Sequence, residues 1–259
     1  MLRFRAASSV GRLSAVALLV AACCGGGGGD SSGGGNAPST LIVYAAASLQ
    51  PAFDKVAAKL KSSQNITATF NYAGTQTLTT QLQQGAGADV FASADTSHMK
   101  VLDDAGLLAG DPKVFVHNRL EIVVERGNPK GVHSLADLAR SGLIVVLADP
   151  SVPAGNYAKQ ALAKAGVTVH PASLEQQVTG VLSKVALGEA DAGIVYHSDI
   201  VTNSKVEGVT IPDSQNVIAD YSIGKLFLTQ HGDAADTFIA YVLSPAGQGI
   251  LKTAGFTGL

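Results

Sequence analysis

The stretch Leu-Ile-Val-Tyr-Ala-Ala-Ala-Ser-Leu, residues 41–49, is an apolar strand that ends in small residues and leads into a helix at Ser48. Small side chains at a strand end leave room for a ligand to approach the backbone, and serine is a favoured N-cap residue. The unpaired N–H groups at a helix start carry a partial positive charge of about half a unit. We therefore expect an anion to bind where this strand meets its helix.

The first residues have the pattern of an export signal. Three arginines precede an apolar run over residues 13–22, and this run is too short to span a bilayer. It ends in Val-Ala-Ala-Cys at Cys23, which resembles the lipobox of bacterial lipoproteins. Gly, Ser, Asn, Asp and Pro then dominate up to residue 40, a composition typical of a flexible tether. The sequence predicts a lipoprotein signal peptide over residues 1–22, a tether over 23–40, and a lipid anchor at Cys23 on the extracytoplasmic face of a bacterial cell membrane.

Composition excludes several classes of protein. Both cysteines lie at positions 23 and 24, so the mature core has neither disulfides nor thiolate metal sites. Without the three signal arginines the formal charge shifts from -2 to about -5. The chain has no basic cluster and no tryptophan, which argues against nucleic-acid binding. Its histidines lack metal-ligand spacing and it has no Gly-x-Ser-x-Gly elbow, so we expect no metal-ligating side chains and no enzyme activity.

Strands and helices alternate along the core, which predicts an α/β fold with largely parallel sheets. The first part has expected strands at residues 41–44, 67–72 and 89–93 and helices at 51–61, 75–84 and 96–105. The second part has extended segments at 119–126, 143–148, 193–196 and 209–212 and helices at 134–140, 154–165 and 178–187. A strand at 221–229 and helices at 233–243 and 246–254 complete the chain and are expected to return to the first part. Two lobes are predicted, over residues 41–118 plus 217–259 and over residues 119–216; a single continuous sheet is the alternative.

Several helix starts share small, neutral residues. Ser48 follows three alanines, Thr75 follows Ala-Gly, and Ala154 lies in Asp-Pro-Ser-Val-Pro-Ala-Gly over residues 149–155. Lys and Arg are absent from these loops. The sequence therefore predicts a neutral anion site made of backbone N–H groups and hydroxyls.

Four segments resemble the molybdate-binding proteins of ABC importers. They are Tyr-Ala-Ala-Ala-Ser-Leu at residues 44–49, Ala-Asp-Val-Phe-Ala-Ser-Ala-Asp at 88–95, Asp-Pro-Ser-Val-Pro-Ala-Gly-Asn-Tyr-Ala at 149–158, and Gly-Ile-Val-Tyr-His-Ser-Asp at 193–199. The resemblance covers nearly the whole mature chain. It implies a two-lobed type II periplasmic-binding-protein fold with the ligand in the interlobe cleft. The implied oxyanion donors are Ser48, Thr75, Ala154, Val178 and Tyr196, where Thr75 replaces a frequent serine and a neighbour could take the role of Val178.

The resemblance also implies what the protein does. A monomeric receptor would capture molybdate, and tungstate as well, without any cofactor, and deliver it to an ABC permease with its cytoplasmic ATPase. A donor-only site suits a fully deprotonated dianion, whereas monohydrogen phosphate needs an acceptor for its proton. Sulfate or another oxyanion is the alternative ligand. From a different class, an anchored hydrolase is the second alternative, because catalytic sets assembled in space leave no compact motif.

Overall fold

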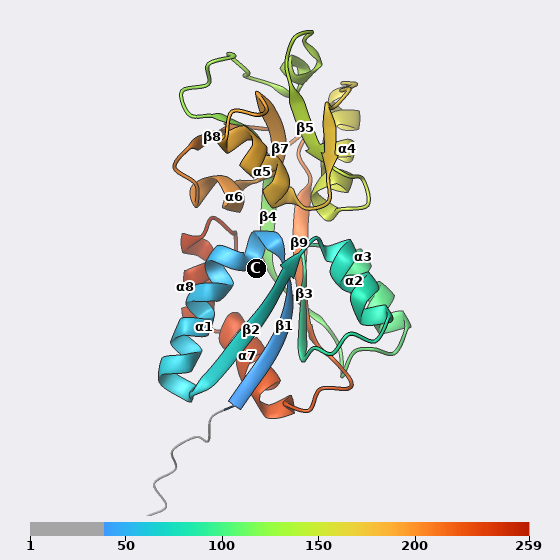
Figure 1. Cartoon of the computed structure of the whole chain (residues 1–259), viewed down its shortest axis with the longest axis vertical. Coiled ribbons are helices and arrows are strands. Elements are labelled where there is room, and N and C mark those ends of the chain that lie inside the picture. Colours follow the sequence, from blue (N-terminus) through green and yellow to red (C-terminus); the bar gives the residue numbers. More distant parts are fainter. Residues whose placement is uncertain (1–38, 259) are drawn as a thin grey trace, which may run out of the picture. The chain divides into compact units, whose positions relative to one another are not determined.

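The computed structural model of the chain describes residues 39–258 (Figure 1). The predicted signal peptide, the lipidation site at Cys23 and most of the tether lie outside the described residues. The first strand includes two residues more at its start than expected, because Ser39 and Thr40 pair with Ile66 and Thr67 of the neighbouring strand. Within the described part, none of the helices has the length and apolar character needed to cross a membrane.

The first part of the chain forms a small parallel sheet with helices beside it. Its elements are β1 (Ser39–Ala46), η1 (Ala47–Leu49), α1 (Gln50–Gln64), β2 (Ile66–Ala73), α2 (Thr75–Gln83), β3 (Val90–Ser93) and α3 (Thr96–Asp104). β1 lies between β2 and β3 and runs parallel to both. Phe53, Val56 and Leu60 of α1 are buried, as their helical spacing predicts.

The second part repeats this arrangement. Its elements are η2 (Leu135–Ala139), β5 (Val145–Ala148), α4 (Pro153–Ala165), β6 (Ser173–Glu175), α5 (Val178–Ala186), β7 (Ala192–Tyr196), α6 (His197–Val201) and β8 (Val206–Thr210). β5 lies between β6 and β7 and is parallel to both. The short elements β6 and α6 were not predicted from the sequence.

Two long strands connect the two parts. The beginning of β4 (Lys113–Glu125) pairs antiparallel with β9 (Ile218–Lys225), and its end pairs antiparallel with β7 and β8. The sheets are therefore mixed, and the prediction of largely parallel sheets is wrong for every pair that β4 or β9 makes. The hydrogen-bonded path β2-β1-β3-β9-β4-β7-β5-β6 is continuous because β4 takes part in both halves.

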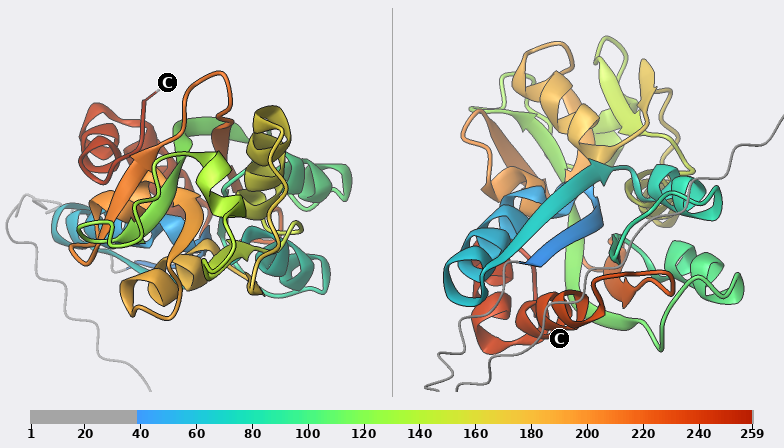
Figure 2. Two further views of the ribbon diagram at one scale, coloured as in Figure 1. Left: turned by 90° about the horizontal axis from the view of Figure 1, so that it is seen from above. Right: turned by 60° about the horizontal axis from the view of Figure 1, so that its bottom comes forward.

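The C-terminal elements return to the first lobe, as the sequence predicts. α7 (Gly232–Leu243) packs on β1 and β9, and α8 (Pro245–Thr253) packs on α1 and α7 (Figure 2). The Phe53 ring packs against Phe115 and Phe238 with centroid distances of 6.0 and 5.5 Å. These contacts tie α1 to β4 and α7. The lobe boundaries at 118/119 and 216/217 stay a prediction.

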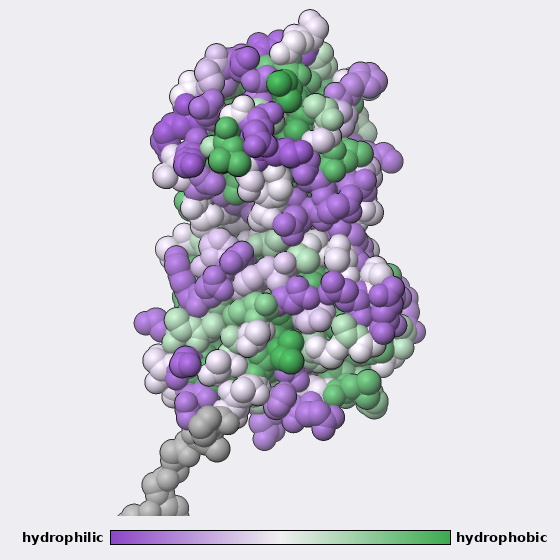
Figure 3. All heavy atoms as spheres, viewed as in Figure 1, coloured by the Kyte–Doolittle hydropathy of each residue, from purple (hydrophilic) through white to green (hydrophobic). Residues whose placement is uncertain are grey.

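Where β4 passes from one lobe to the other, the side chain of Asn216 makes two hydrogen bonds with the backbone of Leu120. Its Oδ1 accepts from Leu120 N at 3.2 Å, and its Nδ2 donates to Leu120 O at 2.9 Å. On the face shown in Figure 3 the surface narrows between the lobes, and hydrophilic and hydrophobic residues alternate over both. The two lobes thus meet around a narrow crossing, and the site lies beside it.

Candidate oxyanion site

A small cavity lies between the lobes and is lined by residues from six turns, each of which leads from a strand into a helix. The lining residues are Ala46, Ala47, Ser48, Ala73, Gly74, Thr75, Ala94, Val152, Pro153, Ala154, Gln177, Val178 and Tyr196. This set contains all five residues predicted as anion donors. Most of the other members are alanine or glycine, so the small residues noted in the sequence are those that leave space beside the backbone.

Three helices begin at the cavity. Thr75 and Val178 are the first residues of α2 and α5, and Ala154 is the second residue of α4. The N–H groups in the first turn of a helix have no partner within that helix, and the helix dipole adds partial positive charge there. Backbone donors from both lobes therefore converge on one space.

The start of α4 depends on a glycine. A Cβ added at Gly155 would overlap the backbone oxygens of Asp149 and Ala148 at the end of β5. Only glycine lets the first turn of α4 approach this strand end so closely. Gly155 thereby fixes the position of the Ala154 N–H at the cavity wall.

The Ser48 hydroxyl does not cap α1, contrary to the sequence-based expectation. The N-cap of α1 is Leu49, which makes no side-chain cap, and Ser48 lies in η1 with its Oγ 2.8 Å from Tyr221 Oη. If the Tyr221 hydroxyl donates in this bond, the single Ser48 proton is left for a ligand. The Thr75 hydroxyl likewise keeps its proton for a ligand, because its Oγ1 accepts a 3.2 Å hydrogen bond from Ala94 N.

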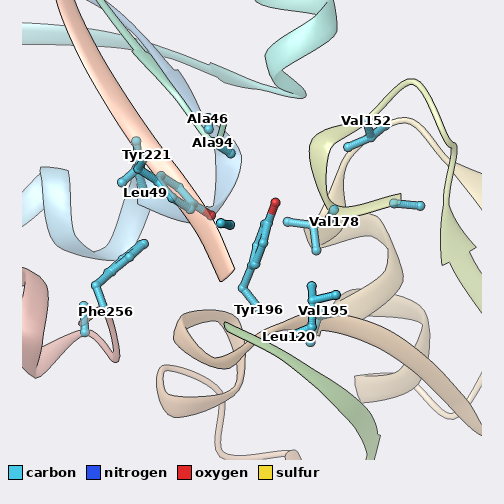
Figure 4. Close-up of a cluster of buried hydrophobic side chains, with 14 of the residues drawn as sticks. Ala46, Leu49, Ala94, Leu120, Val152, Val178, Val195, Tyr196, Tyr221 and Phe256 are labelled. Atoms are coloured by element: carbon cyan, nitrogen blue, oxygen red, sulfur yellow. The ribbon is translucent and has the colours of Figure 1, made fainter. Parts of the chain in front are cut away.

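Tyr196 presents its hydroxyl to the cavity. Figure 4 shows the oxygen pointing into the space between Ala94 of the first lobe and Val178 of the second. The residue is 1% exposed, and its Oη has no hydrogen-bond partner among the residues the structure describes. Burial, followed by the nearby Tyr221, raises the Tyr196 pKa well above its ordinary value. The phenol therefore stays protonated and is available as a donor.

One carboxylate lies directly behind this tyrosine. Asp199 is buried and accepts a 3.1 Å hydrogen bond from the backbone N–H of Tyr196. Burial raises the Asp199 pKa to about 7, although this hydrogen bond partly opposes the shift. Asp199 is not among the cavity-lining residues. Its role in the geometry is to fix the backbone at the point where β7 ends and Tyr196 enters the cavity.

The cavity is neutral and small. No charged side chain is among the described residues that line it. Its volume is about 10 Å³, close to the least space that a water molecule needs, whereas pockets for drug-sized ligands usually measure about 300–1,000 Å³. The lining offers hydrogen-bond donors to a compact group, and the cavity at this width has no room for a sugar, peptide or nucleotide.

Sequence reasoning missed Tyr221 and included Gln177 only as a neighbour that could take the role of Val178. Gln177, the N-cap of α5, lines the cavity beside Val178. Tyr221 is the partner of Ser48 but lies 173 positions away in the chain, so local spacing gives no sign of it. His197, which the sequence places next to Tyr196, pairs instead with Glu121 at 3.1 Å. Within residues 39–258, no group of His, Cys, Asp and Glu side chains forms a candidate metal site.

Comparison with known proteins agrees with this geometry. Residues 41–257 match the family described as bacterial extracellular solute-binding protein. The molybdate-binding protein ModA of Mycobacterium tuberculosis is 44% identical over 219 residues, which cover 84% of each chain. The chain belongs to the ModA family of bacterial extracellular solute-binding proteins. The family resemblance read from the sequence is confirmed, and members of this family are solute-binding proteins and not enzymes.

Solved structures support the same fold. The periplasmic molybdate-binding protein of Azotobacter vinelandii has a TM-score of 0.73 at 21% identity, covering 84% of this chain and 98% of that one. The sulfate-binding protein SubI of Mycobacterium tuberculosis has a TM-score of 0.77 at 19% identity, covering 85% and 87%. Both likenesses concern the fold alone. This ModA-family chain thus has the two-lobed architecture of periplasmic binding proteins, as the sequence predicts.

Proposed function

We propose that this protein is an extracytoplasmic receptor that captures molybdate, and tungstate equally, and delivers the anion to an ABC permease with its cytoplasmic ATPase. The observation that carries the proposal is the neutral interlobe cavity, where N–H groups at helix starts and hydroxyls converge without any charged side chain. Membership of the ModA family supports the choice of molybdate.

The proposed donors are Ser48, Thr75, Ala154, Val178 and Tyr196. Ser48 and Thr75 would donate from hydroxyl and backbone, Ala154 and Val178 from the backbone, and Tyr196 from its phenol. Hydrogen bonds to a charged acceptor contribute about 1.5–3 kcal/mol each. Five or more of them would exceed the roughly 8 kcal/mol of a micromolar complex even after the cost of closing the lobes.

Two properties of the donor set govern selectivity. The lining side chains include hydroxyls but no carboxylate. Hydroxyl donors suit a fully deprotonated dianion, whereas the proton of monohydrogen phosphate would find no charged acceptor in the cavity. Sulfate has the same charge and shape as molybdate, so only the width of the cavity can separate them. Molybdate and tungstate are nearly equal in size and are not expected to be distinguished.

Capture would close the lobes. An anion that contacts the starts of α2 and α5 together binds the closed arrangement better than an open one, and so shifts the population toward it. The closed form would then dock on the permease as a monomer. The lipobox-like segment ending at Cys23 supports anchoring on the outer face of the cell membrane.

Calorimetry on the purified protein tests the ligand. We expect molybdate and tungstate to bind with dissociation constants below about 10 µM, phosphate not to bind, and sulfate to bind more weakly. Strong binding of sulfate with none of molybdate would replace the proposed ligand by the alternative. Absence of binding to every oxyanion, or turnover of esters that Ser48→Ala abolishes, would refute a receptor role.

A separate experiment tests the anchor. Cells expressing the full chain are labelled with radioactive palmitate and fractionated with detergent, and the Cys23→Ser variant serves as the control. We expect label and detergent partitioning only in the unsubstituted chain. Equal release of both proteins into the aqueous phase would rule out the lipid anchor and leave the ligand proposal standing.

A further inference from the structure

The two lobes touch directly at the rim of the cavity. Gly74, the N-cap of α2, lines the cavity in the first lobe, and Gln177, the N-cap of α5, lines it in the second. A Cβ added at Gly74 would clash with the backbone oxygen of Gln176, which immediately precedes Gln177. Peptide backbone is therefore in contact with peptide backbone here, with no side chain of Gly74 between.

A side chain bonds the two lobes at the same point. Gln76 Nε2 donates to Gln176 O at 2.8 Å, across 100 positions of sequence, and also lies 3.3 Å from Thr77 Oγ1. The Gln76 amide packs over Gly74, because an added Cβ would lie 2.6 Å from both its Nε2 and its Oε1. The Gln76 Oε1 is buried without a partner among the described residues. The hydrogen bond from Gln76 to Gln176 thus joins the two lobes, while the other amide atom of Gln76, Oε1, is left without a hydrogen bond.

We propose that the contact of Gly74 with Gln176 is the stop that limits closure and thereby fixes the width of the cavity, with Gln76 latching the closed position. The inference rests on the proposed function and names the residues that set its selectivity. Backbone atoms cannot be displaced as a flexible side chain can, so they make a hard limit. Since the stop lies at the cavity rim, the separation it imposes is passed directly to the donors on α2 and α5.

The unsatisfied Gln76 oxygen gives the latch a further property. In an open cleft this oxygen would be hydrated, so closing costs its desolvation. The latch alone therefore does not favour closure strongly, and the contacts made by the anion must supply the difference. The empty receptor stays free to open, while the loaded receptor closes as far as the stop and no further.

Gly74→Ala tests the stop, because the added methyl group must push the lobes apart. We expect the ratio of the sulfate to the molybdate dissociation constant to rise about tenfold, the discrimination that one methylene-sized change in a pocket typically gives. A cavity that is wider by about one methyl group fits molybdate, the larger anion, better than sulfate. The matched control is Gly249→Ala, where an added Cβ meets nothing within 4 Å and both constants should stay unchanged.

Gln76→Ala separates the latch from the stop. We expect this substitution to raise the dissociation constants of sulfate and molybdate by the same factor, about threefold. The ratio of the two constants should then stay as in the unsubstituted protein. A ratio that is unaltered in Gly74→Ala, or altered equally in Gln76→Ala, would overturn the inference. Binding of neither anion by the unsubstituted protein would instead be a failure of the proposed function.

A measurement on the unsubstituted protein covers the case in which Gly74→Ala does not fold. Crystal structures with sulfate and with molybdate at saturating concentration should show the same contact between Gly74 and Gln176. Closer approach of the lobes around the smaller sulfate would show that the anion, and not the stop, sets the width.

Discussion

Replacing Tyr196 by phenylalanine is expected to affect the free and the loaded protein in opposite directions. The substitution removes only Oη from a side chain that is 1% exposed, and the ring still fills its place beside Tyr221, 5.6 Å away between centroids. Because Oη has no partner among the described residues, the free protein loses no hydrogen bond. Removing a buried, unsatisfied polar atom can relieve about 1–3 kcal/mol.

The loaded protein loses a donor to a charged acceptor. That bond is worth about 1.5–3 kcal/mol, so the dissociation constant for molybdate should rise about 10- to 150-fold. The melting temperature without ligand should stay level or rise, with about 2–4 °C for each kcal/mol gained. Calorimetry and thermal unfolding, each with and without molybdate, measure both effects on the same preparation.

The opposite signs make the result decisive. A core tyrosine with a purely structural hydroxyl would give a lower melting temperature and an unchanged affinity. If Tyr196→Phe melts lower without ligand and binds molybdate within a factor of about two of the unsubstituted protein, the assignment of Tyr196 as an anion donor is refuted.

Three further substitutions test the supporting geometry. Tyr221→Phe should lower both the stability of the free protein and the affinity for molybdate, since the Ser48 hydroxyl loses its 2.8 Å partner; unchanged calorimetric binding would show that Tyr221 does not orient Ser48. Gly155→Ala should destabilise the fold by about 1–3 kcal/mol in urea unfolding, because its Cβ overlaps backbone oxygens at the end of β5; full stability would contradict the close approach. Asp199, with its pKa raised to about 7 from 3.8, keeps its proton in the folded state where the unfolded chain has lost it. Stability should therefore fall as the pH rises from about 4 to 7, and Asp199→Asn should remove that slope in urea unfolding at several pH values; equal slopes would contradict the shift.

The helix starts that form the site could be predicted from the sequence, because each depends on residues that are close together in the chain. Small residues before a helix start, as at Ala73-Gly74-Thr75, leave the first N–H groups of the helix accessible wherever the chain goes next. Those predictions needed no knowledge of tertiary partners. All five predicted donors line the cavity. Val178 and Tyr196 were predicted only through the family resemblance, and the role of all five in binding an anion stays a prediction.

What the sequence could not provide depends on partners far apart in the chain. The Ser48 hydroxyl was expected to cap a helix, but it is hydrogen-bonded to Tyr221 on a strand far away in the sequence. Local spacing could not reveal this partner. The antiparallel pairing of β4 with β9 joins residues about a hundred positions apart, and strand direction has no local signature. The strand β6, at Ser173–Glu175, is too short and too polar for an alternation pattern to identify.

The return of the C-terminal segment to the first lobe has a consequence for the timing of folding. β3 and the first half of β4 both need β9 as their neighbour, and α8 covers α1. The lobe that is synthesised first therefore cannot be completed until the last forty or so residues are available, and contacts of such long range form slowly. The first lobe therefore stays incomplete, with the neighbours of β3 and α1 missing, until the end of the chain has been made.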